Sequence, residues 1–123
     1  MLAASIGWIL LVSGMITAGA GLVATLFPHL FLRFGFGVES PIGSFVFFVR
    51  HWGVLISAVG ALIVYSAYVP TVRAPVLAAA AMEKLAIGLL TFFGPMKPTT
   101  AMTAMAIGDG AFGILYVAYL VGL

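Results

Sequence analysis

Charge is scarce in this chain, and cysteine is absent. Of the 123 residues, 7% are charged and 64% are hydrophobic, whereas soluble domains carry about 25% charged residues. A chain with so few charges cannot form a surface that water wets, which excludes a soluble globular domain and favours an integral membrane protein. The absence of cysteine excludes disulfides, thiolate chemistry and iron–sulfur clusters. The few basic residues form no cluster, which argues against nucleic acid as a partner.

The motifs of the common enzyme and metal-binding classes are missing as well. The chain contains no HExxH, P-loop, GxSxG or CxxC sequence. Its two histidines, His29 and His51, are far apart in the sequence, so we predict no metal site. His51 alone would suffice as an axial ligand for a tetrapyrrole. Phe47, four residues earlier, is bulky where a flat macrocycle needs a small residue, which argues against that cofactor.

Long apolar runs are what the sequence does contain. A helix that crosses a bilayer needs about 20 mostly apolar residues, and four segments meet this requirement. Proline, glycine and serine or threonine separate them at Pro28, Ser40-Pro41, Pro70-Thr71 and Gly94-Pro95. We therefore predict an all-α, integral membrane protein, an antiparallel up-down bundle of four transmembrane helices in one domain, residues 1–123. The expected spans are 3–27, 42–68, 72–93 and 99–123, with an interfacial loop at 28–41.

The interfacial loop has its own pattern. The stretch PHLFLRFGFGVES, residues 28–40, is rich in phenylalanine and carries one arginine. We expect a short helix or re-entrant turn along the membrane surface, ended by Gly35 and Gly37. Two interpretations remain open: a lid or lateral entry for a lipophilic ligand, and an interfacial anchor.

Orientation follows from a small bias in the loops. Arg33 and Lys97 lie in the loops on one side of the bundle, and Arg73 lies on the other. The positive-inside rule makes the Arg33/Lys97 side cytoplasmic, in what we expect to be a bacterial inner membrane. An interfacial aromatic belt is expected at the opposite end, from Trp8, Tyr65, Tyr68, Tyr116 and Tyr119.

Small residues recur at helical spacing in three of the spans. Helices in lipid associate by close packing, which small residues permit. We expect helix-packing faces at Gly7, Gly14 and Gly21, at Gly53 and Ser57, and at Ala104 and Gly108. The spacing leaves open whether these contacts lie within one chain or between chains, and a ligand groove is the alternative.

Five residues with charged or imidazole side chains lie deep inside the predicted spans, at similar heights in the membrane. Glu83 and Lys84 lie about 10 residues, or about 15 Å, into the third span, and Asp109 lies at a similar depth in the fourth. Arg50 and His51 lie slightly closer to the start of the second. An isolated charge at the bilayer centre costs about 2.5–3.5 kcal/mol, so we expect pairs between helices. We predict Arg50 with Glu83 and Lys84 with Asp109, with the reversed pairing as the alternative.

The chain resembles the small DoxX-like four-helix membrane proteins of bacteria. The resemblance rests on the four-span pattern, on RHWGVLISAVGAL at 50–62 and on LFPHLF at 26–31. It implies a small inner-membrane protein, with some relatives linked to quinone-coupled redox complexes. The pair Glu83-Lys84 and the isolated Asp109 are not part of this resemblance.

Buried charges in so small a bundle leave three functions open. The first is a subunit or lipophilic-ligand-binding module of a larger membrane assembly, as a homo-oligomer or with other subunits, with a quinone or another lipophilic molecule as ligand. The second is an oligomeric proton-coupled transporter or channel. The third is an intramembrane isomerase in which Glu83 or Asp109 is the acid or base and Arg50 stabilises charge. Fixing the register of the helices is a purely structural alternative for the same charges.

Overall fold

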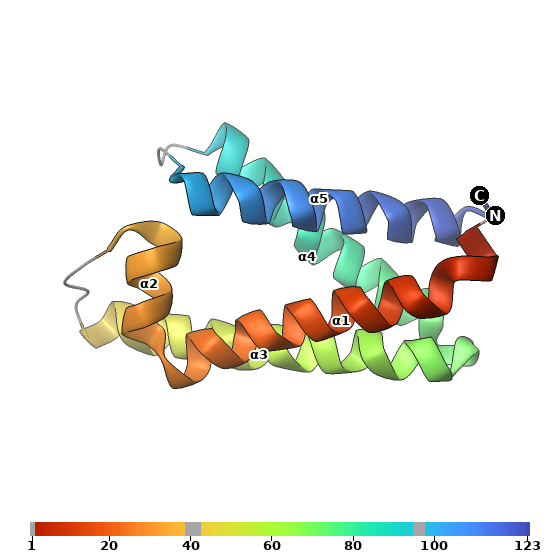
Figure 1. Ribbon diagram of the computed structural model, residues 1–123, viewed down its shortest axis with the longest axis horizontal. Helices are drawn as coiled ribbons and strands as arrows, with labels where there is room; N and C mark the ends of the chain where they lie inside the picture. Colours follow the sequence, from red (N-terminus) through yellow and green to blue (C-terminus); the bar gives the residue numbers. More distant parts are fainter. Residues whose placement is uncertain (1, 39–42, 95–97) are drawn as a thin grey trace.

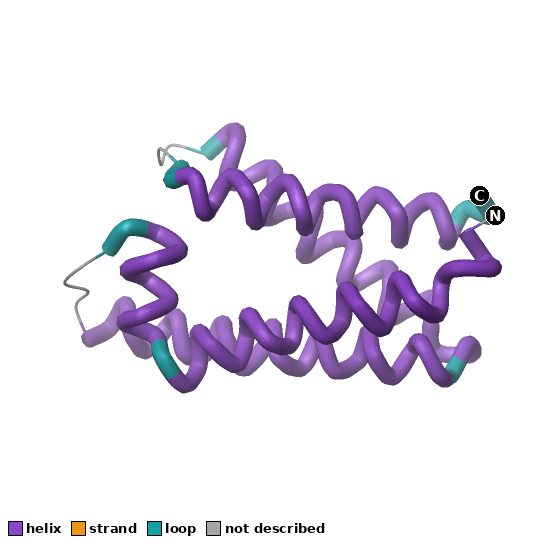
Figure 2. The backbone as a smooth tube through the Cα atoms, viewed as in Figure 1, coloured by secondary structure: helices purple, strands orange, loops and turns teal. Residues whose placement is uncertain are grey.

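Helices make up nearly all of the described chain (Figure 2). The computed structural model describes residues 2–38, 43–94 and 98–123, and the predicted helix start at Ser40-Pro41 and Lys97 lie outside them. The all-α antiparallel fold is confirmed, and four helices are long and apolar enough to cross a membrane. The elements are α1 (Leu2–Leu26), α2 (Pro28–Phe36), α3 (Gly43–Tyr68), the short 3-10 helix η1 (Pro70–Val72), α4 (Arg73–Phe93) and α5 (Thr100–Leu120).

The predicted interfacial segment is the helix α2. Pro28 occupies its first turn, where a missing N–H costs nothing, and Gly37 ends it in the left-handed region at φ 71°. Gly35, expected to help end this segment, lies inside the helix. Phe31 and Leu32 point into the protein and are buried, so α2 packs against the bundle through one face.

The membrane helices are arranged as two antiparallel pairs, α1 with α3 and α4 with α5 (Figure 1). Small residues bring the first pair into backbone contact. A Cβ added at Gly14 would lie 2.7 Å from the Val64 side chain, and one added at Gly21 would collide with Ser57. Gly53 and Gly60 have the same role on α3, and Gly60 faces Ala18.

The predicted glycine face of α1 is shorter than expected. Gly14 and Gly21 lie in the contact with α3, but a Cβ added at Gly7 would meet no atom within 4 Å. The start of α1 rises toward α5 instead (Figure 1). A spacing of seven drifts by about 20° per repeat on a helix, so it does not hold a straight contact along the whole span.

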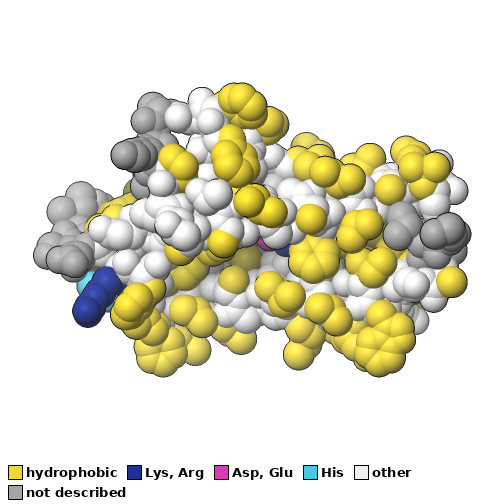
Figure 3. Space-filling model, turned by 45° about the horizontal axis from the view of Figure 1, so that its top comes forward, with side chains coloured by type: hydrophobic (Ala, Val, Ile, Leu, Met, Phe, Trp, Pro, Cys, Tyr) yellow, Lys and Arg dark blue, Asp and Glu magenta, His cyan; other side chains and the backbone are white. Residues whose placement is uncertain are grey.

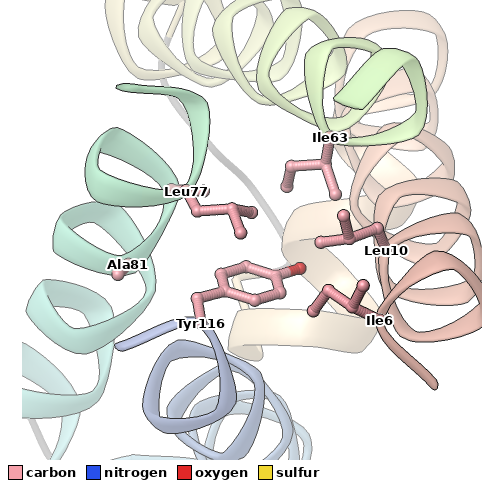
Figure 4. Packing of buried hydrophobic residues seen from close by; sticks show 7 residues of the cluster. Ile6, Leu10, Ile63, Leu77, Ala81 and Tyr116 are labelled. Carbon is pink, nitrogen blue, oxygen red and sulfur yellow. The ribbon is translucent and has the colours of Figure 1, made fainter. Parts of the chain in front are cut away.

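A compact apolar cluster closes the bundle at the end where the two termini lie (Figures 1 and 4). Tyr116 lies at its centre, and its hydroxyl is hydrogen-bonded to Ser13 on α1. Tyr116 is fully buried, so its predicted place in an interfacial belt is wrong. Trp8, Tyr65 and Tyr68 are exposed. The cluster consists of Ile6, Leu10, Ile63, Leu77, Ala80, Ala81 and Tyr116.

Arg73 fastens the turn between α3 and α4 at this same end. Its Nε donates to the Ser66 carbonyl at 2.7 Å, and its Nη2 donates to the Ala67 carbonyl at 2.9 Å. These carbonyls belong to the last turn of α3, where helix carbonyls lack partners within the helix. A cation there also interacts favourably with the helix dipole.

At the opposite end, α2 lies between the two pairs. Phe31 and Leu32 pack with Ala24 of α1 and Val49 of α3. Thr99 caps α5 by accepting from the Met102 N–H at 3.1 Å, and its hydroxyl donates to the Gly35 carbonyl at 2.9 Å. The two pairs are therefore packed directly at one end and are connected through α2 at the other (Figure 1).

Candidate functional site

Lys84 and Asp109 form a salt bridge near the middle of the bundle. The Lys84 Nζ lies 3.0 Å from the Asp109 Oδ1, which is one of the two predicted pairs. The Lys84 side chain is 2% exposed and the Asp109 side chain is 32% exposed. The lysine is thus enclosed by protein, while the aspartate retains an open side.

A third helix contributes to this pair through Thr17, which the sequence reasoning missed. The Lys84 Nζ donates to the Thr17 Oγ1 at 2.8 Å, and that hydroxyl donates to the Ser13 carbonyl at 2.8 Å. Lys84 therefore links α4 to α1 and to α5. Polar residues four apart, Ser13 and Thr17, share one face of a helix and are rare in an apolar span, so their spacing was the available signal.

The predicted pair of Arg50 and Glu83 is wrong. Arg50 is exposed on α3, and the Glu83 Oε2 is buried without a hydrogen-bond partner among the described residues. The reason is the direction in which each side chain points around its helix. The buried face of α3 runs through Val49, Gly53 and Ile56, and Arg50 is turned about 100° away from Val49.

A cavity of about 370 Å³ lies beside these charges, between the two helix pairs. Its volume is within the range of about 300–1,000 Å³ that small-molecule sites occupy. Acidic and basic atoms are visible at the bottom of a hollow between apolar side chains (Figure 3). The lining residues are Ile16, Thr17, Ala20, Phe31, Trp52, Ile56, Glu83, Lys84, Ala104, Met105, Gly108, Asp109 and Phe112.

The predicted packing residues of α5 line this cavity. Ala104 is exposed, and a Cβ added at Gly108 would meet no atom within 4 Å. Among the predicted small residues, Gly108 and Ala104 thus border open space rather than another helix. Close packing of α4 and α5 occurs instead at Gly113, where an added Cβ would lie 3.1 Å from Leu85.

His51 takes no part in the site. It is exposed on α3 and does not line the cavity. The described residues contain no group of three or more histidine, cysteine, aspartate or glutamate side chains able to hold a metal ion. The chemistry of the cavity therefore rests on a lysine, two carboxylates and a hydroxyl.

Comparisons with protein-family models, with curated proteins and with solved structures find no match for this chain. The structure supports the coarser part of the resemblance, namely a small protein with four long apolar helices.

Proposed function

We propose that this chain is an intramembrane binding module for a lipophilic molecule that carries a polar head. The observation behind the proposal is the cavity of about 370 Å³ that contains Glu83, Lys84 and Asp109 between apolar and aromatic walls. Binding sites for small molecules are typically apolar spaces with a few polar groups that fix the orientation of the ligand.

The state of the three charged groups favours binding over a purely structural role. Lys84 and Asp109 neutralise each other, and the Thr17 hydroxyl accepts a second hydrogen bond from the ammonium. The Glu83 Oε2 has no such partner among the described residues, although it lies in the same space. A buried polar atom without a partner is costly, and a ligand that hydrogen-bonds to it recovers that cost.

Proton conduction is less well supported by the hydrogen bonds. A relay of protons needs hydroxyls, carboxyls or water in sequence. Tyr116 and Thr17 are connected through Ser13, but Thr17 donates to the Ser13 carbonyl, which carries no transferable proton. The hydrogen bonds of the described residues therefore form no continuous proton path from Lys84 and Asp109 toward the end of the bundle.

An intramembrane isomerase is the second candidate function. The same cavity favours it, because a carboxylate beside an apolar substrate is placed to move a proton. Glu83 would be the acid or base, and Lys84 takes the stabilising role expected of Arg50, which is exposed. In that case a bound compound is converted by the wild type and left unchanged by Glu83→Gln.

The proposal extends to the assembly in which the chain works. Apolar side chains cover the outer faces of all four spans, which suits contact with lipids, with further copies of the chain or with other membrane subunits. The resemblance to DoxX-like proteins makes a quinone one ligand to test. The positive-inside rule places the α2 end, which carries Arg33, on the cytoplasmic side of a bacterial inner membrane.

A filled cavity tests the binding function directly. Gly108→Leu adds a side chain into the cavity without a clash at its Cβ. Gly110→Leu is the matched control, because its added Cβ also meets no atom within 4 Å and it borders a groove on the other side of α5. Each protein is purified from native membranes in mild detergent, and the co-purified lipophilic compounds are quantified by mass spectrometry.

The expected result is a compound enriched with the wild type and with Gly110→Leu and lost from Gly108→Leu. Equal amounts in both glycine variants would contradict the proposal, because the cavity would then hold nothing. A size measurement on the same samples tests the assembly: recovery of the free monomer alone would contradict that part.

A further inference from the structure

A second space adjoins the cavity on the side of α2. It is an apolar groove of about 320 Å³. Phe31 and Trp52 line both the groove and the cavity, and their ring centroids are 5.4 Å apart. This aromatic pair therefore separates a space that contains charges from one that contains none. The groove is lined by Phe31, Leu32, Phe36, Val38, Phe45, Phe48, Val49, Trp52 and Ile87.

We infer that the ligand is a neutral, single-chain lipid with a hydroxyl head, which binds with the head beside Glu83 and the chain in the groove. The inference rests on the proposed binding function and specifies the class of ligand. The chain would run around the outer edge of the Phe31–Trp52 pair, because rings whose centroids are 5.4 Å apart are in contact and leave no gap between them.

The depth of the charges excludes ordinary phospholipids. Glu83 and Asp109 lie near the middle of 21-residue helices, about 15 Å from either surface of the hydrocarbon core. A phospholipid would have to carry its charged headgroup over that distance. A hydroxyl is compact and neutral, so it reaches this depth at a much smaller cost.

The balance of charges excludes an anionic head. Lys84 is already bonded to Asp109 and Thr17, so a phosphate or carboxylate would meet Glu83 with no cation to spare among the groups that line the cavity. The Glu83 Oε2 instead needs a donor. A hydroxyl supplies one.

The groove suits one flexible chain. Its walls are apolar, and Phe45 and Phe48 at its rim are exposed on the outer surface of α3. Chains in lipid gain no hydrophobic free energy from entering such a groove, because the bilayer is equally apolar. The head therefore determines affinity, and the groove determines where the chain lies.

Farnesol, a linear isoprenoid alcohol, is a suitable probe in nanodiscs. Its affinity is compared with those of farnesyl methyl ether, farnesylamine and farnesyl phosphate, which share the chain and differ in the head. We expect farnesol to bind about tenfold more tightly than the ether, which lacks the donor, and the difference to vanish in Glu83→Met. Tighter binding of the ether, the amine or the phosphate would overturn the assignment of the head.

The position of the chain is tested by a farnesol analogue with a diazirine at the end of the chain. Photolysis should label the groove, and Phe48→Ala should reduce labelling there. Phe47→Ala is the control, since Phe47 is adjacent, equally exposed and absent from the groove lining. Labelling confined to other surfaces would overturn the chain assignment. If Gly108→Leu retains the co-purified compound, the binding function itself fails, which is a separate result.

Discussion

Replacing Asp109 by leucine should destabilise the bundle more than replacing Lys84 by methionine, and making both changes should restore most of the lost stability. The asymmetry comes from burial. Asp109→Leu strands an ammonium whose side chain is 2% exposed, with Thr17 as its remaining hydrogen-bond partner. Breaking a buried ion pair in this way costs about 3–5 kcal/mol.

Lys84→Met strands the other partner in a milder environment. The Asp109 side chain is 32% exposed toward the cavity, so it is less tightly enclosed by protein than Lys84. We expect a cost of about 1–3 kcal/mol, the range for an acceptor left without its partner. The double variant removes both charges and should lie within about 1 kcal/mol of the wild type, because an apolar pair of similar volume replaces a buried ion pair at little cost.

The free energy of unfolding is measured by titration with SDS in mixed micelles for the wild type, the two single variants and the double variant. The four values form a double-mutant cycle. Arg33→Met is the control for loss of one positive charge, because Arg33 is exposed on α2 and should show no measurable effect. Additive costs in the double variant would refute the reasoning, since they would mean that Lys84 and Asp109 do not stabilise each other. A smaller cost for Asp109→Leu than for Lys84→Met would refute the argument from burial.

Three further predictions concern stability, and each is measured by the same unfolding titration. Gly60→Ala should cost about 1–3 kcal/mol because its Cβ would collide with the Ala18 backbone. Gly19→Ala is the control and should be neutral or stabilising, because a Cβ there meets no atom within 4 Å. Equal effects of the two substitutions would contradict the close contact of α1 and α3. Tyr116→Phe should cost about 0.5–1.5 kcal/mol by removing the buried bond to Ser13, and a zero cost would rule out that bond. Arg73→Met should cost about 1.5 kcal/mol, because it removes the hydrogen bonds to two carbonyls of α3. Arg73→Lys should cost less but not nothing, because an ammonium lacks the planar guanidinium that reaches both carbonyls. Full stability of Arg73→Lys would contradict this geometry.

The spans and their ends could be predicted because they depend on local properties. The length of an apolar run identifies a membrane helix. Pro28, Gly37 and Gly94 mark positions where helices begin or end. The heights of the charges follow from the same count of residues. Lys84 and Asp109 were therefore expected to meet, and they do.

The parts that could not be predicted depend on the direction in which each residue faces around its helix and on how far apart the helices lie. Arg50 was assigned to Glu83 on depth alone, but the face of α3 that carries Gly53 and Ile56 points elsewhere. Tyr116 lies near the end of its span, which is typical of an interfacial residue, yet it is fully buried because α1 rises toward α5 at that point. Neither feature is determined by the sequence of a single helix.

The cavity and the charges account for each other. Two helix pairs packed along their whole length would bury Glu83 in apolar surroundings, where a carboxylate without a partner is costly. Phe31 and Leu32 fix α2 on α1 and α3, α2 meets α5 at the bond between Thr99 and the Gly35 carbonyl, and the space that the carboxylates line lies beside it. Without the charges, the same space would be an apolar gap that lipid chains fill. An open space between the helix pairs and charged groups at mid-height are therefore what we expect of the proposed site for a polar-headed lipid, whereas a fully packed bundle needs neither.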